Sequence, residues 1–380
     1  WTPCEISSTC KSFGIKRKHH GKYGNLRLID PLFWKDKRVF LTGHTGFKGS
    51  WLCIWLNLLG AKVRGYSLSP SKPVSLFNES RLDSIIDSHL GDIRDQKLLN
   101  HKIKEFDPDI LIHMAAQSLV RYSYISPIET YEVNVMGTAN VLEVARNCSS
   151  LKAVVNITSD KCYENDGRQQ GYKENDPMGG KDPYSSSKGC AELVTSAYRS
   201  SFLMDKNIGL ASARAGNVIG GGDWASDRLI PDIIKFFQKN EPVVIRNPKA
   251  VRPWQHVLEP LSGYLIIAQK LYENPKKYAD SWNFGPNEKD VKSVDWIIDQ
   301  MIELWPGNSW ILDKSKNPHE AELLNLDISK ASKLLDWKPT WDLQITLKNT
   351  LLWYRQWLEG ADMQKLCLNE IMSFTNEMNK

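Results

Sequence analysis

The sequence predicts an α/β protein in which a Rossmann-type, doubly wound parallel sheet is followed by a smaller mixed α/β lobe. From Lys37 onward, short runs of β-branched residues alternate with amphipathic segments of helical length, as in a parallel sheet covered by helices on both faces. The glycine-rich stretch VFLTGHTGFKGSWL joins the first such run to the first helical segment, which is typical of dinucleotide-binding folds. After Gly216 the alternation becomes irregular, which indicates the second lobe.

The predicted parallel sheet has six strands, separated by four helices. We expect the strands at residues 38–42, 62–66, 86–90, 110–113, 153–158 and 210–215, and the helices at 49–59, 96–106, 127–147 and 184–202. Gly60 follows the first helix, where a glycine commonly ends a helix. In the second lobe we expect a glycine-rich loop, a helix at 229–239, a strand at 243–246 and helices at 260–272 and 293–304.

The composition excludes several classes of protein. With 41% hydrophobic and 24% charged residues in 380, the chain has the make-up of a globular enzyme. It contains no apolar run of 18 residues, so we expect no membrane partner and a cytoplasmic location. The net charge of +5 is small and partly concentrated in the first 30 residues, which argues against nucleic acid. The seven cysteines form neither a CxxC pair nor a zinc-site spacing, so we expect reduced thiols and no metal.

The glycine-rich stretch is the first candidate ligand site. Gly43, Gly46 and Gly49 allow a tight turn and a close approach of the backbone to a pyrophosphate at the N-terminus of the following helix. Thr45 and Phe47 lie within the same turn and are further candidate cofactor contacts. A strand before the turn and a helix after it are the context that makes this motif specific.

The choice of dinucleotide is less directly encoded. The Asp or Glu that often binds the adenosine ribose, about 20 residues on, is absent, because the sequence there reads Gly-Tyr-Ser-Leu from Gly65. No arginine follows that strand to hold a 2′-phosphate, and Arg64 lies within it, so we expect NAD rather than NADP. Asp92 and Ile93, after the third strand, are candidates for holding the adenine, although Asp92 could instead belong to a helix N-cap.

A tyrosine and a lysine four residues apart form the second motif, in DPYSSSKGCAEL. On a helix, this spacing places Tyr184 and Lys188 on one face. A phenol with a pKa near 10 is a poor base at neutral pH, but a nearby ammonium and the NAD cation both favour its phenolate form. Alone, the pair could be incidental; combined with the glycine turn, it indicates hydride transfer at an alcohol carbon.

Three polar residues end the fifth predicted strand, in NITSDKCYEN. Ser159, Asp160 and Lys161 therefore lie at the carboxyl edge of the sheet, where ligands bind in open α/β folds. Ser159 can hydrogen bond to a substrate hydroxyl beside Tyr184. Asp160 and Lys161 add an acid and an amine that a simple dehydrogenase does not need, although Asp160 could also be a loop or helix cap.

Together these motifs resemble the extended branch of the short-chain dehydrogenase/reductase superfamily. The resemblance runs from about residue 33 to the C-terminus and includes HMAAQ, a helical Asn134, the Ser…Tyr-x-x-x-Lys set and LLDWKPTWDL. It implies that Ala115, Ala116 and Gln117 contact NAD, as do Tyr184 and Lys188. It also implies a homodimer or homotetramer that pairs through the helices at 127–147 and 184–202.

Within that branch, the strings TGHTGFKGSWL, NITSDKCY, RAGNVIGGGDWASDRLIPD and RPWQHVLEPLSGYL resemble nucleotide-sugar 4,6-dehydratases, with CDP-glucose as the implied substrate. Relatives that use dTDP-glucose carry Thr-Asp-Glu where this chain has Ser-Asp-Lys from Ser159. The resemblance implies an internal redox cycle in which Tyr184 takes the proton of the 4-hydroxyl and Asp160 protonates the departing 6-hydroxyl. Lys161 would remove the C5 proton, and the product would supply deoxysugars for a surface polysaccharide such as O-antigen.

The resemblance also implies how the substrate is held and how the chain is divided. Arg214 could be structural, whereas the candidate substrate contacts are Gln117, Asn134, Asn217, Arg228 and Arg252. Residues 1–30 would be an extension, because they are polar, basic and rich in turn formers. Residues 31–215 would bind NAD and residues 216–380 the nucleotide sugar, with part of 250–270 packing back onto the first domain.

Two other readings of the motifs remain open. The first is a sugar-nucleotide epimerase, or a 4,6-dehydratase that acts on a dTDP- or GDP-sugar. Asp160 and Lys161 argue against an epimerase, since a C4 epimerase never eliminates water. The second is a non-catalytic NAD sensor, because this fold also serves sensing. The presence of Ser159, Tyr184 and Lys188 argues against the sensor.

Overall fold

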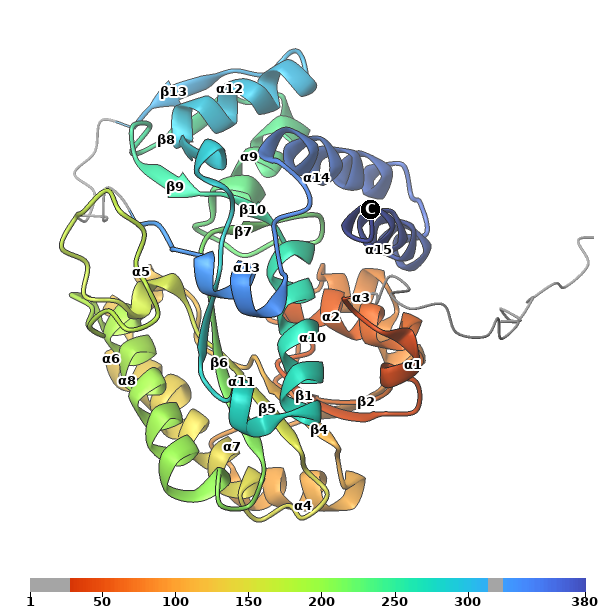
Figure 1. Cartoon of the computed structure of the whole chain (residues 1–380). Helices are drawn as coiled ribbons and strands as arrows, with labels where there is room; N and C mark the ends of the chain where they lie inside the picture. Colours follow the sequence, from red (N-terminus) through yellow and green to blue (C-terminus); the bar gives the residue numbers. More distant parts are fainter. Residues whose placement is uncertain (1–27, 314–323) are drawn as a thin grey trace, which may run out of the picture.

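The computed structural model describes residues 28–313 and 324–380, and its centre is a seven-stranded, entirely parallel sheet (Figure 1). Residues 1–27 of the predicted extension lie outside the described part. The strand order is β11-β6-β5-β4-β1-β2-β3. The strands are β1 (Arg38–Thr42), β2 (Lys62–Ser67), β3 (Asp87–Leu90), β4 (Ile110–His113), β5 (Ala153–Ile157), β6 (Gly209–Ala215) and β11 (Ser281–Phe284). The strand order reverses between β1 and β4, which in such sheets opens a ligand crevice.

Helices cover both faces of the sheet (Figure 1). Successive side chains of β1 alternate between two apolar cores, with Val39 and Leu41 in one and Phe40 in the other. The first core contains α2 (Phe47–Leu58) and α10 (Leu258–Glu273), and the second contains α4 (Gln96–Phe106), α7 (Gly137–Ala145) and α8 (Pro183–Tyr198). The six predicted strands and the predicted helices of this part are confirmed to within a few residues at their ends.

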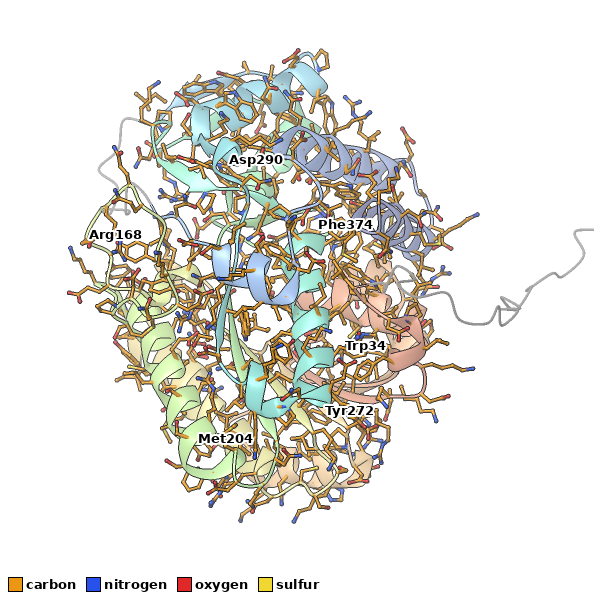
Figure 2. All side chains as sticks on the ribbon, in the orientation of Figure 1. Trp34, Arg168, Met204, Tyr272, Asp290 and Phe374 are labelled. Atoms are coloured by element: carbon orange, nitrogen blue, oxygen red, sulfur yellow. The ribbon has the colours of Figure 1, made fainter. Side chains whose placement is uncertain are left out.

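Two C-terminal helices, which the sequence analysis did not predict, extend the first core. They are α14 (Leu343–Leu358) and α15 (Met363–Met378). On α15, Phe374 points inward (Figure 2) and its ring packs edge-on against Trp55 of α2 and Trp341, at 5.8 and 5.1 Å between ring centres. The C-terminal helix therefore packs against α2, the helix that follows the glycine turn.

The smaller lobe lies beyond the carboxyl edge of the sheet (Figure 1). It contains α9 (Leu229–Lys239), α12 (Val294–Leu304) and two strand pairs: β8 (Val243–Ile245) parallel to β13 (Trp310–Leu312), and β9 (Val251–Pro253) antiparallel to β12 (Val291–Ser293). A third short pair, β7 (Val218–Ile219) with β10 (Gln255–His256), joins the lobe to α10. Because α10 packs on β5 and β6, the chain returns from the lobe to the sheet before β11.

The predicted helix at 127–147 is divided in the structure. It consists of α6 (Pro127–Tyr131), a π-helical turn (Glu132–Met136) and α7. The π turn buries Asn134, whose side chain accepts from the backbone N–H of Gln117 at 2.8 Å and donates to its carbonyl at 2.9 Å. These bonds to a distant loop explain the interruption. The other short helices are α1 (Pro31–Trp34), α3 (Leu76–Glu79), α5 (Val120–Ile125), α11 (Pro275–Tyr278) and α13 (Ser329–Leu335).

Candidate active site

One large cavity, of about 1740 Å³, lies between the sheet and the smaller lobe. Its wall runs from the glycine turn, past the carboxyl ends of β4, β5 and β6, to α9 and β8. All five predicted catalytic residues line it: Ser159, Asp160, Lys161, Tyr184 and Lys188. Among the described residues, no group of three or more His, Cys, Asp or Glu side chains could hold a metal ion, and no helix there is long and apolar enough to span a membrane.

The glycine turn is shaped by close backbone contacts. Gly43 has a φ of +83°, and a Cβ there would lie 2.7 Å from the backbone nitrogen of Ala115. A Cβ on Gly49 would lie only 2.1 Å from the carbonyl oxygen of Gly43. Gly46 caps the N-terminus of α2 without a side-chain hydrogen bond. The first N–H groups of α2 therefore face the cavity and suit a pyrophosphate.

The remaining predicted cofactor contacts surround this turn. Thr45 lines the cavity and donates its hydroxyl to the carbonyl of Leu68 at 2.8 Å, at the end of β2. Asp92 also lines it, and the Arg94 guanidinium, 2.7 Å away, lowers the pKa of this carboxyl. Asp92 does not cap the next helix, because Asp95 is the N-cap of α4. The other cavity-lining candidates are Phe47, Ile93, Ala115 and Ala116.

Gln117 and Asn134 are placed differently from the sequence-based expectation, since neither lines the cavity. The Gln117 amide donates to Leu119 O and Thr130 Oγ1, and the Asn134 amide donates to Ser187 Oγ of α8. Their hydrogen-bonding groups are used within the protein. In this structure the two residues hold the loop after β4 against α8. Their contacts with the substrate, and that of Gln117 with NAD, stay predictions.

The Ser-Asp-Lys segment after β5 forms a short 3₁₀ turn. Ser159 is its N-cap: its hydroxyl accepts from the backbone N–H of Lys161 at 3.2 Å and donates to Asp160 Oδ1 at 2.9 Å. Asp160 is buried, which raises the pKa of its carboxyl despite the opposing effects of Lys161, Ser159 and Arg252. A Cβ on Gly216 would lie 2.6 Å from Asp160 Oδ2, so the end of β6 packs directly on this acid.

Tyr184 and Lys188 occupy the first turns of α8, as the four-residue spacing predicted. Asp182 caps this helix by accepting from Ser185 N at 2.9 Å. Burial raises the pKa of Tyr184 to about 12, and Ser159 opposes that rise, while burial lowers the pKa of Lys188 to about 8. In the protein alone, desolvation exceeds the opposing effects of Ser159 and Arg228 on the pKa of the phenol. The predicted lowering of this pKa also involves the NAD cation, so it stays a prediction.

Lys48 is a buried cation of the site that the sequence analysis missed. It lies in the first turn of α2, lines the cavity, and donates to the hydroxyl of Tyr264 at 2.8 Å. Burial, together with nearby Lys188 and Arg228, lowers its pKa to about 7. The available signal was a lysine inside the glycine turn, between Gly46 and Gly49, where the helix faces the ligand.

Behind the site, a buried ion pair ties two strands to α8. Glu192 and Arg214 are 2.7 Å apart, with 3% of each side chain exposed. Glu192 also accepts the hydroxyls of Ser212 and Thr158, the latter immediately before Ser159. Arg214 further donates to the hydroxyl of Tyr163 at 2.7 Å. Arg214 does not line the cavity, which fits the structural role that the sequence left open.

The predicted diphosphate contacts lie after β6 and in the smaller lobe. Asn217, Arg228 and Arg252 all line the cavity. The Arg228 guanidinium is held by Asp223 at 2.9 Å and by Ser118 Oγ at 3.1 Å. Two oriented arginines suit a diphosphate, since a guanidinium can donate two parallel hydrogen bonds to one phosphate.

Comparison with known proteins places this cavity among nucleotide-sugar enzymes. The family model "GDP-mannose 4,6 dehydratase" matches residues 40–350. The chain is 55% identical to CDP-glucose 4,6-dehydratase of Salmonella typhimurium (strain LT2) over 353 residues, 91% of this chain and 98% of that protein. A probable dTDP-glucose 4,6-dehydratase of Sinorhizobium fredii is 25% identical over 340 residues, 83% of this chain and 92% of that protein.

Two solved structures share the fold. UDP-glucose 4-epimerase of Thermotoga maritima superposes with a TM-score of 0.75 at 19% identity, over 84% of this chain and 99% of that one. The dTDP-glucose 4,6-dehydratase of Bacillus anthracis, solved in complex with NAD, superposes with a TM-score of 0.72 at 22% identity, over 87% of this chain and 99% of that one.

Proposed function

The chain belongs to the GDP-mannose 4,6-dehydratase family of nucleotide-sugar dehydratases, and from this premise we propose that it converts CDP-glucose to CDP-4-keto-6-deoxyglucose and water. We assign CDP-glucose as the substrate on the basis of the 55% identity to the Salmonella CDP-glucose 4,6-dehydratase across 98% of that protein's length. The cavity supports the reaction, because it gathers one acid, one amine and the tyrosine–lysine pair around the end of β5. We further propose that the product feeds deoxysugar synthesis for a surface polysaccharide, as the motif strings imply.

The residues around the glycine turn fit NAD as the cofactor. Neither Gly43 nor Gly49 could carry a Cβ, and the uncapped N-terminus of α2 offers N–H groups to a pyrophosphate. Arg64 does not line the cavity and is paired with Asp87 at 2.5 Å, so it is not placed to hold a 2′-phosphate. NAD held at this turn would supply reversible hydride transfer with the sugar.

The protein's own side chains would move the protons. Tyr184 takes the proton of the 4-hydroxyl, while Ser159 hydrogen bonds to the same oxygen, and C4 becomes a ketone. The ketone acidifies C5, so Lys161 can remove that proton as Asp160 protonates the leaving 6-hydroxyl, which departs as water. Lys161 then returns a proton to C5. The raised pKa of Asp160 supports this role, because a proton donor must be protonated at the working pH.

The reaction is tested by incubating the purified protein with NAD and CDP-glucose and recording the alkaline absorbance of a 4-keto-6-deoxy sugar. UDP-, dTDP- and GDP-glucose serve as competing substrates. Product from CDP-glucose alone, or in large excess, supports the proposal. Preference for dTDP- or GDP-glucose would assign a different dehydratase, a 4-epimer without loss of water would assign an epimerase, and no product from any of the four would favour an NAD sensor.

Replacing Lys161 by Gln should stop the reaction after the first hydride transfer. Lys161→Gln retains a hydrogen-bonding side chain of nearly the same length but cannot accept the C5 proton, so solvent deuterium should no longer enter C5 and turnover should fall by about 100-fold or more. Mass spectrometry of the sugar measures the exchange. The matched control is Lys152→Gln, an exposed lysine before β5, outside the cavity. Exchange and turnover near the native rate in Lys161→Gln would identify another group as the base.

Replacing Arg252 by Ala should weaken substrate binding more than it slows the chemistry. Arg252 lies on β9 of the smaller lobe, lines the cavity and opposes the rise in the pKa of Asp160, so it faces the region where the diphosphate would lie. We expect KM for CDP-glucose to rise by about tenfold or more, because charge-assisted hydrogen bonds to the diphosphate are lost. Steady-state kinetics measure KM and kcat separately. An unchanged KM would remove Arg252 from the diphosphate site.

We also propose a homodimer or homotetramer formed through the segments 127–147 and 184–202. Exposed apolar side chains on these segments include Ile128 (70%), Met136 (57%) and Leu193 (61%). An exposed apolar patch of this kind commonly marks a protein interface. Within each chain, residues 31–215 would hold NAD and 216–380 the nucleotide sugar, with α10 and β11 returning to the sheet.

A further inference from the structure

The end of the cavity that the smaller lobe forms has a mixed apolar and charged lining. It is formed by the first turn of α9 and by β8. Leu229, Pro231, Val243 and Ile245 contribute apolar surface, and Asp232 and Arg246 contribute the charges. If the sugar lies at Tyr184 and Lys161 and the diphosphate at Arg228 and Arg252, the nucleoside extends to this end. The apolar side chains can cover the two faces of a planar base there.

Three acids line this end of the cavity, Asp227, Asp232 and Asp313. The Asp232 carboxylate has no partner within the described residues. Asp227 is held by Arg121 at 2.9 Å and lies 4.0 Å from Arg246. No hydrogen bond or ion pair links the Asp232 carboxylate to any residue in 28–313 or 324–380, although Asp232 is only partly exposed and lines the cavity. The loss of water raises the pKa of this carboxyl, with Asp227 adding to the effect and Arg246 opposing it. A partly buried carboxylate of this kind is suited to a ligand that donates hydrogen bonds.

The pyrimidines differ at the edge that such a carboxylate would meet. Cytosine has an exocyclic amino group that donates, whereas uracil and thymine have an oxygen that accepts. A carboxylate only accepts, so it attracts the cytosine amino group and repels the uracil or thymine oxygen. Arg246 only donates, and it suits the acceptors at N3 and O2 of cytosine. Arg246 lines the same end of the cavity as Asp232 and is near enough to oppose the rise in the pKa of that carboxyl.

We propose that Asp232, assisted by Arg246, selects the cytosine base of the nucleotide sugar by accepting a hydrogen bond from its amino group. This inference rests on the proposed function and adds the residue that determines its nucleotide specificity. Asp232 is far from the reacting carbons by this placement. Its substitution should therefore change which nucleotide sugar is used, and not the chemistry performed on the sugar.

The test is the ratio of kcat/KM for CDP-glucose to kcat/KM for UDP-glucose in Asp232→Asn. The carboxamide has the same size but can donate to the uracil oxygen, so this ratio should fall by roughly tenfold or more. Asp232→Ala should lose CDP-glucose activity without gaining UDP-glucose activity. The matched control is Asp299→Asn, an acid on α12 of the same lobe that does not line the cavity, and it should leave the ratio unchanged.

Calorimetric titration with CDP and with UDP separates this proposal from the proposed reaction. Wild-type protein should bind CDP more tightly, and Asp232→Asn should lose most of that preference. If this binding pattern appears without turnover of CDP-glucose, the proposed reaction fails and the base selection stands. If CDP-glucose is turned over but neither the kinetic ratio nor the CDP preference changes in Asp232→Asn, Asp232 does not read the base and this inference is wrong.

Discussion

Tyr184→Phe should lower kcat by about 100-fold or more while leaving the binding of CDP-glucose and NAD within a few-fold of wild type. Tyr184 is 7% exposed in the first turn of α8, and phenylalanine retains its ring and its packing. Only the hydroxyl is lost, and with it the group that takes the 4-hydroxyl proton. Positioned general bases contribute on the order of 10² to 10⁴ in rate. Product formation gives kcat, and calorimetric titration gives the two affinities.

The pH dependence of the same variant provides an independent check. The pKa of Tyr184 is raised to about 12 by burial in the protein alone, so its active phenolate form becomes more populated as the pH rises. Wild-type kcat/KM should therefore increase with pH on the alkaline side of neutrality, until the protein's stability limits the measurement. The residual activity of Tyr184→Phe should lack this increase. The control is Tyr122→Phe, an exposed tyrosine of α5 outside the cavity, which should behave as wild type. A Tyr184→Phe enzyme within tenfold of wild type would contradict the assignment.

The sheet was predictable because its strands are local patterns, whereas β11 was not. Six strands lie where the alternation of short strands and helical segments predicts them, and each lies within two residues of its expected position. Ser281–Phe284 comes after this regular alternation has ended, and it pairs in parallel with β6 at the edge of the sheet. The π turn around Asn134 likewise depends on bonds to residue 117, more than a dozen positions away. Contacts between residues distant in sequence do not produce a hydrophobic periodicity, so the sequence pattern does not predict them.

The chemistry of the site was predictable by residue type but not by environment. The motifs around Ser159 and Tyr184 identified the family, which the comparisons confirm, and these residues do line one cavity. Spacing did not reveal that desolvation raises the pKa of Tyr184. Spacing also did not show that the Gln117 amide bonds to Thr130 and that the Asn134 amide bonds to Ser187. Burial and hydrogen-bond partners follow from tertiary packing, which the motifs do not encode.

Glu192→Gln should destabilise the fold by about 3 kcal/mol or more, the second large effect that we expect. Glutamine preserves the shape of the side chain but leaves the buried guanidinium of Arg214 without its counter-charge, and breaking one partner of a buried pair typically costs 3–5 kcal/mol. Urea unfolding, followed by circular dichroism, gives the free energy of unfolding. The control is Asp36→Asn: this exposed acid lies 3.5 Å from Lys62, with 66% of its side chain exposed, and a surface pair contributes about 1 kcal/mol or less.

A double substitution separates loss of charge balance from loss of hydrogen bonds in this pair. If the cost of Glu192→Gln comes mainly from the unpaired guanidinium, then Glu192→Gln combined with Arg214→Met should be more stable than Glu192→Gln alone, because no buried charge remains. The same pair holds Thr158, the residue before Ser159, to α8. A folded double variant should therefore lose turnover at saturating substrate even where stability is recovered, since the Ser159 segment is less firmly held opposite Tyr184. A Glu192→Gln protein no less stable than Asp36→Asn would show that the ion pair contributes little to the fold.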